Sequence, residues 1–512
     1  MIKKYNFIEL GFYLFSFLTV SLILYNRQIL LGLHYDDSFI TYRYAINFSE
    51  GRGFVFYTGE RINSASSLLY TLILSTFHFI GFKNLQVVSS LIGLLSGIGV
   101  IYLAYLFVCN FVSKILYRAY ILIPFVFSGS IIAWATSGME TLFFMYLMLL
   151  FLKYYIKNNF IITTLLLCLL LICRAESVII LGTVLIVELF SAVNNKNYLT
   201  FFSFLIFGTF TITLYFLWNY LYFDSIIPHP VRFKNISRYY NPNIFDSLKE
   251  IFRFYFVKNS ILTVLSIASI LNLISNFIKS RTKFIDNKLL VTLSLYLLLS
   301  VGSFIVGPYS DFNRYMIHTI PIMAIMSAIF ISHNYITIVK YKYIHISVLF
   351  ISILILIREN RNISNYFYNS SIHQEKRIVV GKYINSKINH SDLIYSSDIG
   401  AISYFALNNH FVDLSGLTSL IPFYFIEKSQ SVNYNEWLKS HKIVWVADTE
   451  SNGKISSLEI LKQPSNYFNT IRSDSNYSLN LYDISNKLIL KESIGGDLNI
   501  VLMKLNKNLY LK

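Results

Sequence analysis

Residues 85–109 read LQVVSSLIGLLSGIGVIYLAYLFVC, a stretch without a single charged side chain. It exceeds the roughly 20 apolar residues with which an α-helix crosses a hydrocarbon core of about 30 Å. Comparable apolar runs recur through the first 357 residues. The stretch therefore predicts a membrane-spanning helix, and its repetition predicts a polytopic, all-α membrane domain over residues 1–357.

Twelve apolar runs are candidates for membrane spans. They lie at 7–33, 67–82, 85–109, 118–135, 140–156, 160–173, 177–193, 198–222, 259–278, 288–307, 314–332 and 343–357. The second run is short and contains His78, so it could instead lie along the outer interface of the membrane. Whether it crosses decides the side of every later loop.

The distribution of Lys and Arg favours about eleven spans. With 67–82 as an interfacial segment and the N-terminus in the cytoplasm, 34–66 becomes an external loop. The cytoplasmic loops then collect the cations, with Asp286 as the acidic exception. These cations are Lys3, Lys4, Lys114, Arg118, Lys153, Lys157, Lys196, Lys279, Arg281, Lys283, Lys288, Lys340 and Lys342. The twelve-span alternative places most of them outside.

The overall composition agrees with a membrane protein. Of the 512 residues 55% are hydrophobic and only 14% charged, against about a quarter charged in soluble domains. A net charge of +16 would suggest nucleic acid in a soluble protein, but here it follows from cytoplasmic loops, so no nucleic-acid partner is expected. The three cysteines lie in or beside apolar runs, which leaves the C-terminal segment without a disulfide framework.

Hydropathy falls from residue 358 onward, and charges of both signs mix. We expect residues 358–512 to form a soluble, mixed α/β domain outside the cytoplasm. An amphipathic helix is predicted at 371–389, and Asp398-Ile-Gly-Ala-Ile-Ser-Tyr404 reads as a strand end that turns into a helix. Strands are predicted at 392–396, 410–414, 442–447, 479–484, 487–491 and 499–505. The chain contains no GxGxxG, P-loop or HExxH motif, so an obvious nucleotide or zinc domain is not indicated.

Two adjacent carboxylates, Asp36 and Asp37, directly follow the first apolar run. Carboxylates at a membrane face are costly unless they are solvated or used. A solvated start of a loop is one interpretation. The other is catalytic, because the pair opens an amphipathic helix on which Arg43 can face the same cleft. An acid pair with an Arg suits a reaction in which a hydroxyl is deprotonated and a phosphate departs.

Further polar residues lie at the predicted outer face, each with a structural alternative. Glu140 begins a span, where the helix dipole alone favours a carboxylate. Arg174 and Glu176 are spaced for a local ion pair. His229 lies between two prolines in an extended loop and is more often a structural residue. Arg314 and His318 begin a span where a polyprenyl phosphate could be held, although an interfacial Arg is also a common membrane anchor.

Several of these segments together resemble the GT-C membrane glycosyltransferases, and most closely the terminal arabinofuranosyltransferase type and its bacterial relatives. The resemblance covers about residues 30–420. It is carried, in order, by Asp36-Asp-Ser-Phe-Ile-Thr-Tyr-Arg-Tyr44, Gly51-Arg-Gly-Phe-Val-Phe-Tyr-Thr-Gly-Glu-Arg61, Ser137-Gly-Met-Glu-Thr141, Arg174-Ala-Glu176, Tyr222-Phe-Asp-Ser-Ile-Ile-Pro-His229, Arg314-Tyr-Met-Ile-His-Thr-Ile-Pro321, Asp398-Ile-Gly-Ala-Ile-Ser-Tyr404 and Val412-Asp-Leu-Ser-Gly-Leu417. The chain departs from the usual pattern around Ser64–Ser67, where that pattern has Asn-Pro, and at His229, where it has Asn.

The resemblance implies a multi-pass protein of the bacterial inner membrane. It would transfer a sugar from a polyprenyl-phosphate donor to a glycan, lipid or protein acceptor of the cell envelope at the outer face, with inversion at the sugar. The implied catalytic residues are Asp36, Asp37 and Glu140, the carboxylates that a divalent cation such as Mg²⁺ or Mn²⁺ would also use. Arg43, Arg174, Glu176, His229, Arg314 and His318 are the expected substrate-binding residues.

Two other functions share parts of this pattern. A glycan polymerase or ligase has the same architecture but moves a preassembled glycan. A transporter of lipid-linked glycans should carry ionisable residues near the middle of its spans and internal repeats. Here the charges gather at one face, which favours an enzyme.

Overall fold

The computed structural model describes residues 6–231, 244–280, 288–306, 314–340, 342–396, 399–413, 418, 443–451, 454–455, 487–489 and 498–504. Two compact units are present, each built from separate segments. The helical unit comprises Met1–Gly32, Ser89–Tyr215 and Asn243–Phe367. The loop–tail unit comprises Leu33–Val88, Phe216–Pro242 and Tyr368–Lys512, and so joins the predicted external loop to the predicted C-terminal domain. The predicted boundary at 357/358 stays a prediction.

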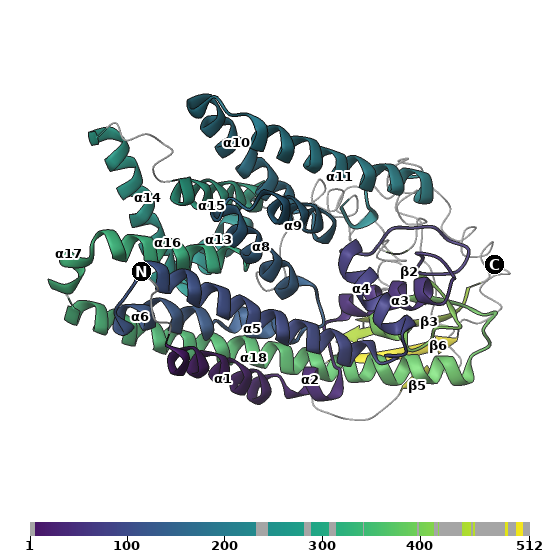
Figure 1. Cartoon of the computed structure of the whole chain (residues 1–512). Helices are drawn as coiled ribbons and strands as arrows, with labels where there is room; N and C mark the ends of the chain where they lie inside the picture. Colours follow the sequence, from purple (N-terminus) through teal and green to yellow (C-terminus); the bar gives the residue numbers. More distant parts are fainter. Residues whose placement is uncertain are drawn as a thin grey trace. The chain divides into compact units, whose positions relative to one another are not determined.

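Six helices in the described part of the chain are long and apolar enough to cross a membrane. They are α1 (Phe7–Leu24), α5 (Leu85–Phe111), α10 (Ser177–Asn195), α11 (Leu199–Phe223), α14 (Ser260–Ser280) and α15 (Lys288–Val306), labelled in Figure 1. A bent pair, α6 (Ile115–Val126) and α7 (Gly129–Thr136), makes a seventh candidate. The polytopic helical architecture is thereby confirmed.

Shorter helices occupy the remaining predicted spans. They are α8 (Thr141–Ile156), α9 (Phe160–Cys173) and α16 (Thr319–His333). The predicted interfacial segment forms α4 (Leu68–Phe79), and the last predicted span lies within α18 (Lys342–Lys387), a helix of 46 residues. The short elements α2 (Asn26–Leu31), α13 (Ile244–Phe252), the π-helix η1 (Arg253–Lys258) and α17 (Tyr335–Lys340) complete the described helices outside the loop–tail unit. The number of eleven spans stays a prediction.

The bend between α6 and α7 lies at Phe127 and Ser128, after Pro124 of α6. Pro124 lies inside α6 and has no N–H to donate to the preceding turn, which weakens a helix at that point. The two helices meet at 48°. Asn360 donates a hydrogen bond of 2.7 Å from its side chain to the carbonyl of Phe127 at the bend. A backbone carbonyl at a helix end needs a partner where water is excluded, and Asn360 supplies one to Phe127 at the bend.

The loop–tail unit combines two helices from its first segment, Leu33–Val88, with a mixed sheet of the tail (Figure 1). The helices are α3 (Asp36–Ser49) and α4. The sheet has the order β2-β1-β3-β6-β5, with β4 on β3. Its strands are β1 (Leu393–Ser396), β2 (His410–Asp413), β3 (Ile443–Ser451), β4 (Lys454–Ile455), β5 (Lys487–Ile489) and β6 (Leu498–Lys504). β1 is parallel to β2 and β3, whereas β6 is antiparallel to β3 and β5.

The described strands other than β4 lie on predicted strand segments, whereas β4 was not predicted. The predicted strand 479–484 lies outside the described residues. The segment predicted to turn from strand to helix forms α19 (Gly400–Tyr404).

One hydrophobic core holds the loop–tail unit together, and both the loop and the tail contribute side chains to it. Tyr44, Phe54 and Phe56 from the loop pack with Ile384 and Phe411 from the tail. Because each such side chain removes apolar surface from water, worth about 1.5–3 kcal/mol, loop and tail stabilise one another.

Candidate functional site

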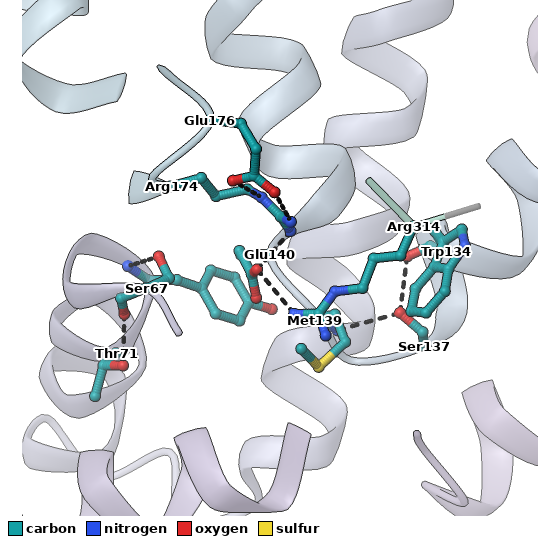
Figure 2. Close-up of polar contacts among 10 residues, drawn as sticks. Ser67, Thr71, Trp134, Ser137, Met139, Glu140, Arg174, Glu176 and Arg314 are labelled. Atoms are coloured by element: carbon teal, nitrogen blue, oxygen red, sulfur yellow. Dashed lines mark hydrogen bonds and ion pairs between the residues drawn. The ribbon is translucent and has the colours of Figure 1, made fainter. Parts of the chain in front are cut away.

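A tight turn between α7 and α8 places Glu140. Gly138 has φ +79°, a conformation that glycine adopts without steric cost. The hydroxyl of Ser137 donates to the carbonyl of Trp134 at 3.0 Å and accepts from the amide of Met139 at 3.3 Å. The turn ends at Glu140, the residue before α8, whose side chain is buried with 1% exposure. The segment Ser137–Thr141 therefore forms a turn that buries a carboxylate at the start of a helix (Figure 2).

Glu140 lies between two guanidinium groups. Arg174 donates from Nη1 to Glu140 Oε1 at 2.7 Å, and Arg314 donates from Nη2 to the same oxygen at 3.1 Å. Arg174 also binds Glu176 in a bidentate manner, with Nη2 to Oε1 at 2.7 Å and Nε to Oε2 at 3.2 Å. Figure 2 shows the resulting chain of carboxylates and guanidinium groups. We name Glu140, Arg174, Glu176 and Arg314 the Arg–Glu cluster.

The expected local pair of Arg174 and Glu176 is thus present, but it is part of a larger network. Both residues lie in the turn between α9 and α10. Burial by itself would raise the pKa of the Glu176 carboxyl, yet the charge and hydrogen bonds of Arg174 hold that pKa at about 2. Burial opposes the charge of Arg174, and its two carboxylate partners outweigh this and raise its pKa. Arg174 and Glu176 are therefore both ionised at neutral pH.

His318 and several aromatic rings adjoin the Arg–Glu cluster. His318 lies one turn after Arg314, and its Nδ1 is 2.7 Å from the hydroxyl of Tyr296. Its ring packs at 6.0 Å from that of Phe144, and the guanidinium of Arg174 lies 5.9 Å from the same Phe144 ring. The sequence had singled out His318 but not Tyr296 or Phe144, because an aromatic residue in an apolar helix carries no signal of its own.

Asp36 has a different environment, within the loop–tail unit. Its carboxylate accepts hydrogen bonds from the amides of Gly400 and Ala401 at 3.1 and 3.0 Å, at the start of α19. The side chain of Gln374 donates to it at 3.1 Å, and Arg377 lies at 4.0 Å. Neither Gln374 nor Arg377 was expected at the site. Asp36 therefore joins the start of α3 to the tail, and we call these contacts the Asp36 anchor.

Asp37 follows in the first turn of α3 and is partly exposed. Arg43, on the same helix, is buried, and its donors reach carbonyl groups of the unit. Its Nε donates to Phe56, and its terminal nitrogens donate to Ser403, Leu407 and Asn409. Burial lowers the pKa of Arg43 to about 10, so it stays charged at neutral pH. This geometry favours a structural role for Arg43 over the expected binding of substrate.

His229 is also buried in the loop–tail unit. Its backbone amide donates to the carbonyl of Asn63 at 3.0 Å, and the side chain of Asn63 donates to Asn219 at 2.7 Å. The loop around Pro228 is thereby joined to the segment around Asn63. Among the described residues no group of three or more His, Cys, Asp and Glu side chains is arranged to hold a metal ion.

Asp36 and Asp37 belong to the loop–tail unit, whereas Glu140, Arg174, Glu176, Arg314 and His318 belong to the helical unit. Within the helical unit the structure brings the five expected residues together. Within the loop–tail unit, Asp36 and Arg43 form hydrogen bonds with the tail, which gives these two residues a structural role.

Comparison with known proteins defines the class of fold. Over nearly its whole length the chain has the same fold as a solved structure. The structure that shows this is ArnT from Cupriavidus metallidurans bound to undecaprenyl phosphate, with a TM-score of 0.50 at 11% identity, covering 96% of this chain and 98% of ArnT. Its apo structure gives a TM-score of 0.49 at 11% identity, covering 98% and 99%. At such identity the similarity shows the fold alone.

Two sequence comparisons add to this. Residues 364–482 match a family described as a domain of unknown function, DUF8728. No curated protein matches the chain in sequence. The matched segment begins within α18 and covers much of the tail, so the similarity to this family concerns the loop–tail unit.

Proposed function

We propose that this protein is a GT-C glycosyltransferase of the bacterial inner membrane. It transfers a sugar from a polyprenyl-phosphate donor to a glycan, lipid or protein of the cell envelope, at the outer face. The observation that carries the proposal is the Arg–Glu cluster at the helix ends of an ArnT-like fold. That ArnT was crystallised with undecaprenyl phosphate supports a polyprenyl carrier for this chain too. We propose further that it is closest to the terminal arabinofuranosyltransferase type.

The acid pair of α3 supplies the base. In our mechanism Asp37 takes the proton of the acceptor hydroxyl, whose oxygen forms a bond to the anomeric carbon of the donor sugar. The bond from that carbon to the phosphate oxygen breaks on the opposite side, and polyprenyl phosphate departs with the electron pair. The sugar is transferred with inversion. We assign the base to Asp37 and a positioning role to Asp36, whose carboxylate accepts three hydrogen bonds from the tail.

Asp36 is then a positioning residue. Its contacts with Gly400 and Ala401 hold the start of α3 in a fixed place relative to the tail. A base must stand within hydrogen-bond reach of the proton that it removes, and small displacements cost rate. The Asp36 anchor thus orients the neighbouring carboxylate.

The test is transfer of sugar by the purified full chain in nanodiscs, with undecaprenyl-phosphate sugars as donors. Asp37→Asn should lower the rate by about 10²–10⁴, the typical contribution of a general base, with unchanged thermal stability. Asp36→Asn should lower both stability and rate. The control is Asp224→Asn, an exposed position with φ +53° that Asn also accepts. A wild-type rate for Asp37→Asn would overturn the assignment, and absence of transfer from any such donor by the wild type would overturn the function.

A further inference from the structure

Among the described residues, the buried polar atoms at the Arg–Glu cluster that have no hydrogen-bond partner include three from Glu140, Thr141 and His318. These three are Oε2 of Glu140, Oγ1 of Thr141 and Nε2 of His318. The three residues are at most 2% exposed. A buried polar atom without a partner costs about 1–3 kcal/mol, and more when it is charged. Such atoms in a folded protein call for an explanation, of which a bound ligand is one.

Two of the three atoms lie at the start of α8, and the third belongs to His318, whose ring packs against the same helix. Thr141 is the first residue of α8 and follows Glu140 directly. Phe144 lies one turn further along α8, and the His318 ring packs against it at 6.0 Å. Because Tyr296 engages Nδ1 of His318, Nε2 is the ring nitrogen that a ligand would meet. The atoms thus come from two elements of the helical unit that approach each other at Phe144.

The charge of the cluster indicates what kind of ligand fits. Two guanidinium groups and two carboxylates sum to zero, and each guanidinium already has a carboxylate within 3.1 Å. A phosphate would have to compete with Glu140 and Glu176 for these donors. A neutral ligand does not disturb the balance, and it avoids the cost of burying a further charge.

The unpartnered atoms match hydroxyl groups. A carboxylate oxygen accepts, a threonine hydroxyl both donates and accepts, and an imidazole nitrogen does one or the other according to its tautomer. Several hydroxyl groups on one neutral, compact group are the property of a sugar. Phe144 adds an apolar ring at the same place, against which the C–H face of a sugar can pack.

We propose that Glu140, Thr141 and His318 form the subsite for the sugar of the lipid-linked donor, and that the phosphate is bound elsewhere. This inference rests on the proposed function. It differs from the sequence-based expectation that Arg314 and His318 hold the phosphate. In this arrangement Arg174 and Arg314 are positioning residues that keep Oε1 of Glu140 in place and leave Oε2 for the ligand.

The decisive variant is Thr141→Val, which removes the hydroxyl and keeps the shape. Because this hydroxyl has no partner in the free protein, the variant should unfold at a temperature no lower than wild type. The matched control is Thr183→Val in α10, whose hydroxyl donates to the carbonyl of Ile179 at 2.7 Å. The control should lose thermal stability and keep its ligand affinities.

Binding is measured on the full chain in nanodiscs with two probes. One is undecaprenyl phosphate, and the other is a panel of its esters with the neutral sugars glucose, mannose, galactose and arabinofuranose. Wild type should bind at least one ester more tightly than the bare lipid. Thr141→Val should weaken that ester about tenfold, since a lost hydrogen bond leaves a ligand hydroxyl unpaired, and leave the bare lipid unchanged. Glu140→Gln should likewise weaken binding of the ester more than binding of the bare lipid.

Three kinds of result would contradict these expectations. Equal weakening of ester and bare lipid by Thr141→Val would identify the cluster as a phosphate site and overturn the inference. An unchanged preference for the ester in both Thr141→Val and Glu140→Gln, or no ester preferred by wild type, would also overturn it. Absence of binding of bare lipid and esters alike by wild type would overturn the proposed function itself.

Discussion

The Asp36 carboxylate caps α19, accepting hydrogen bonds from the amides of Gly400 at 3.1 Å and Ala401 at 3.0 Å. Asp36 and Gly400 are 364 positions apart in the sequence, so the contact joins two distant segments of the loop–tail unit. A carboxylate that accepts backbone N–H groups at a helix start is stabilised by those donors and by the helix end. Asp36 is therefore as much a folding residue as a member of the acid pair.

Gly400→Ala tests the anchor without touching Asp36. A Cβ on Gly400 would overlap both the carboxylate and the backbone carbonyl of Asp36, so α3 and α19 must separate. We expect a loss of about 1–3 kcal/mol in stability and faster proteolysis of the tail. Gly182→Ala in α10 is the control, because nothing lies within 4 Å of its Cβ; it should be neutral or slightly stabilising. Equal behaviour of the two variants would contradict the anchor.

Arg174→Gln should be among the most damaging single substitutions in the helical unit. It leaves Glu176 without its ion pair and Glu140 with Arg314 alone. Breaking a buried pair typically costs about 3–5 kcal/mol. Arg52→Gln is the control, since Arg52 and Glu50 form an exposed pair at 34% and 42% exposure, worth less than about 1 kcal/mol. Thermal unfolding in nanodiscs compares them, and a cost for Arg174→Gln as small as that of the control would show the cluster to be solvated.

Acid should weaken the helical unit through Glu176. Its pKa falls from an ordinary value of 4.5 to about 2 on folding. A depressed carboxyl pKa contributes stability that is present above the unfolded pKa and is lost as the pH falls through the folded one. We expect up to about 3 kcal/mol to disappear between pH 4.5 and 2. The unfolding temperature of Glu176→Gln should be lower at pH 7 and should fall less in this window; parallel pH curves for wild type and variant would contradict the assignment.

The sidedness derived from Lys and Arg makes a prediction for the tail. Eleven spans from a cytoplasmic N-terminus place residues 358–512 outside. Alkaline phosphatase fused after Lys512 should be active, and the same enzyme fused at Lys157 or Lys196, in predicted cytoplasmic loops, should be inactive. Activity of only a cytoplasmic reporter at Lys512 would make 67–82 a full span, with twelve spans in all.

The sequence by itself determined the parts of this protein that depend on local composition. Apolar runs specify membrane helices because the cost of burying polar groups in hydrocarbon is counted residue by residue along one helix. The pair of Arg174 and Glu176, two positions apart, was likewise visible, as was the turn at Gly138. The lengths of the helices did not follow from the apolar runs, since several predicted spans fold as shorter helices or as the bent pair α6 and α7.

Only the tertiary structure decided which charges meet. Glu140 receives Arg314 from 174 positions away, and Arg43 is engaged by carbonyls of the tail. An ion pair or a capping contact depends on a few ångströms between distant segments, and hydropathy carries no information about that distance. For the same reason the adjacent residues Asp36 and Asp37 look alike in sequence, while the Asp36 anchor sets them apart: packing of the tail against α3 engages the first carboxylate with Gly400 and Ala401.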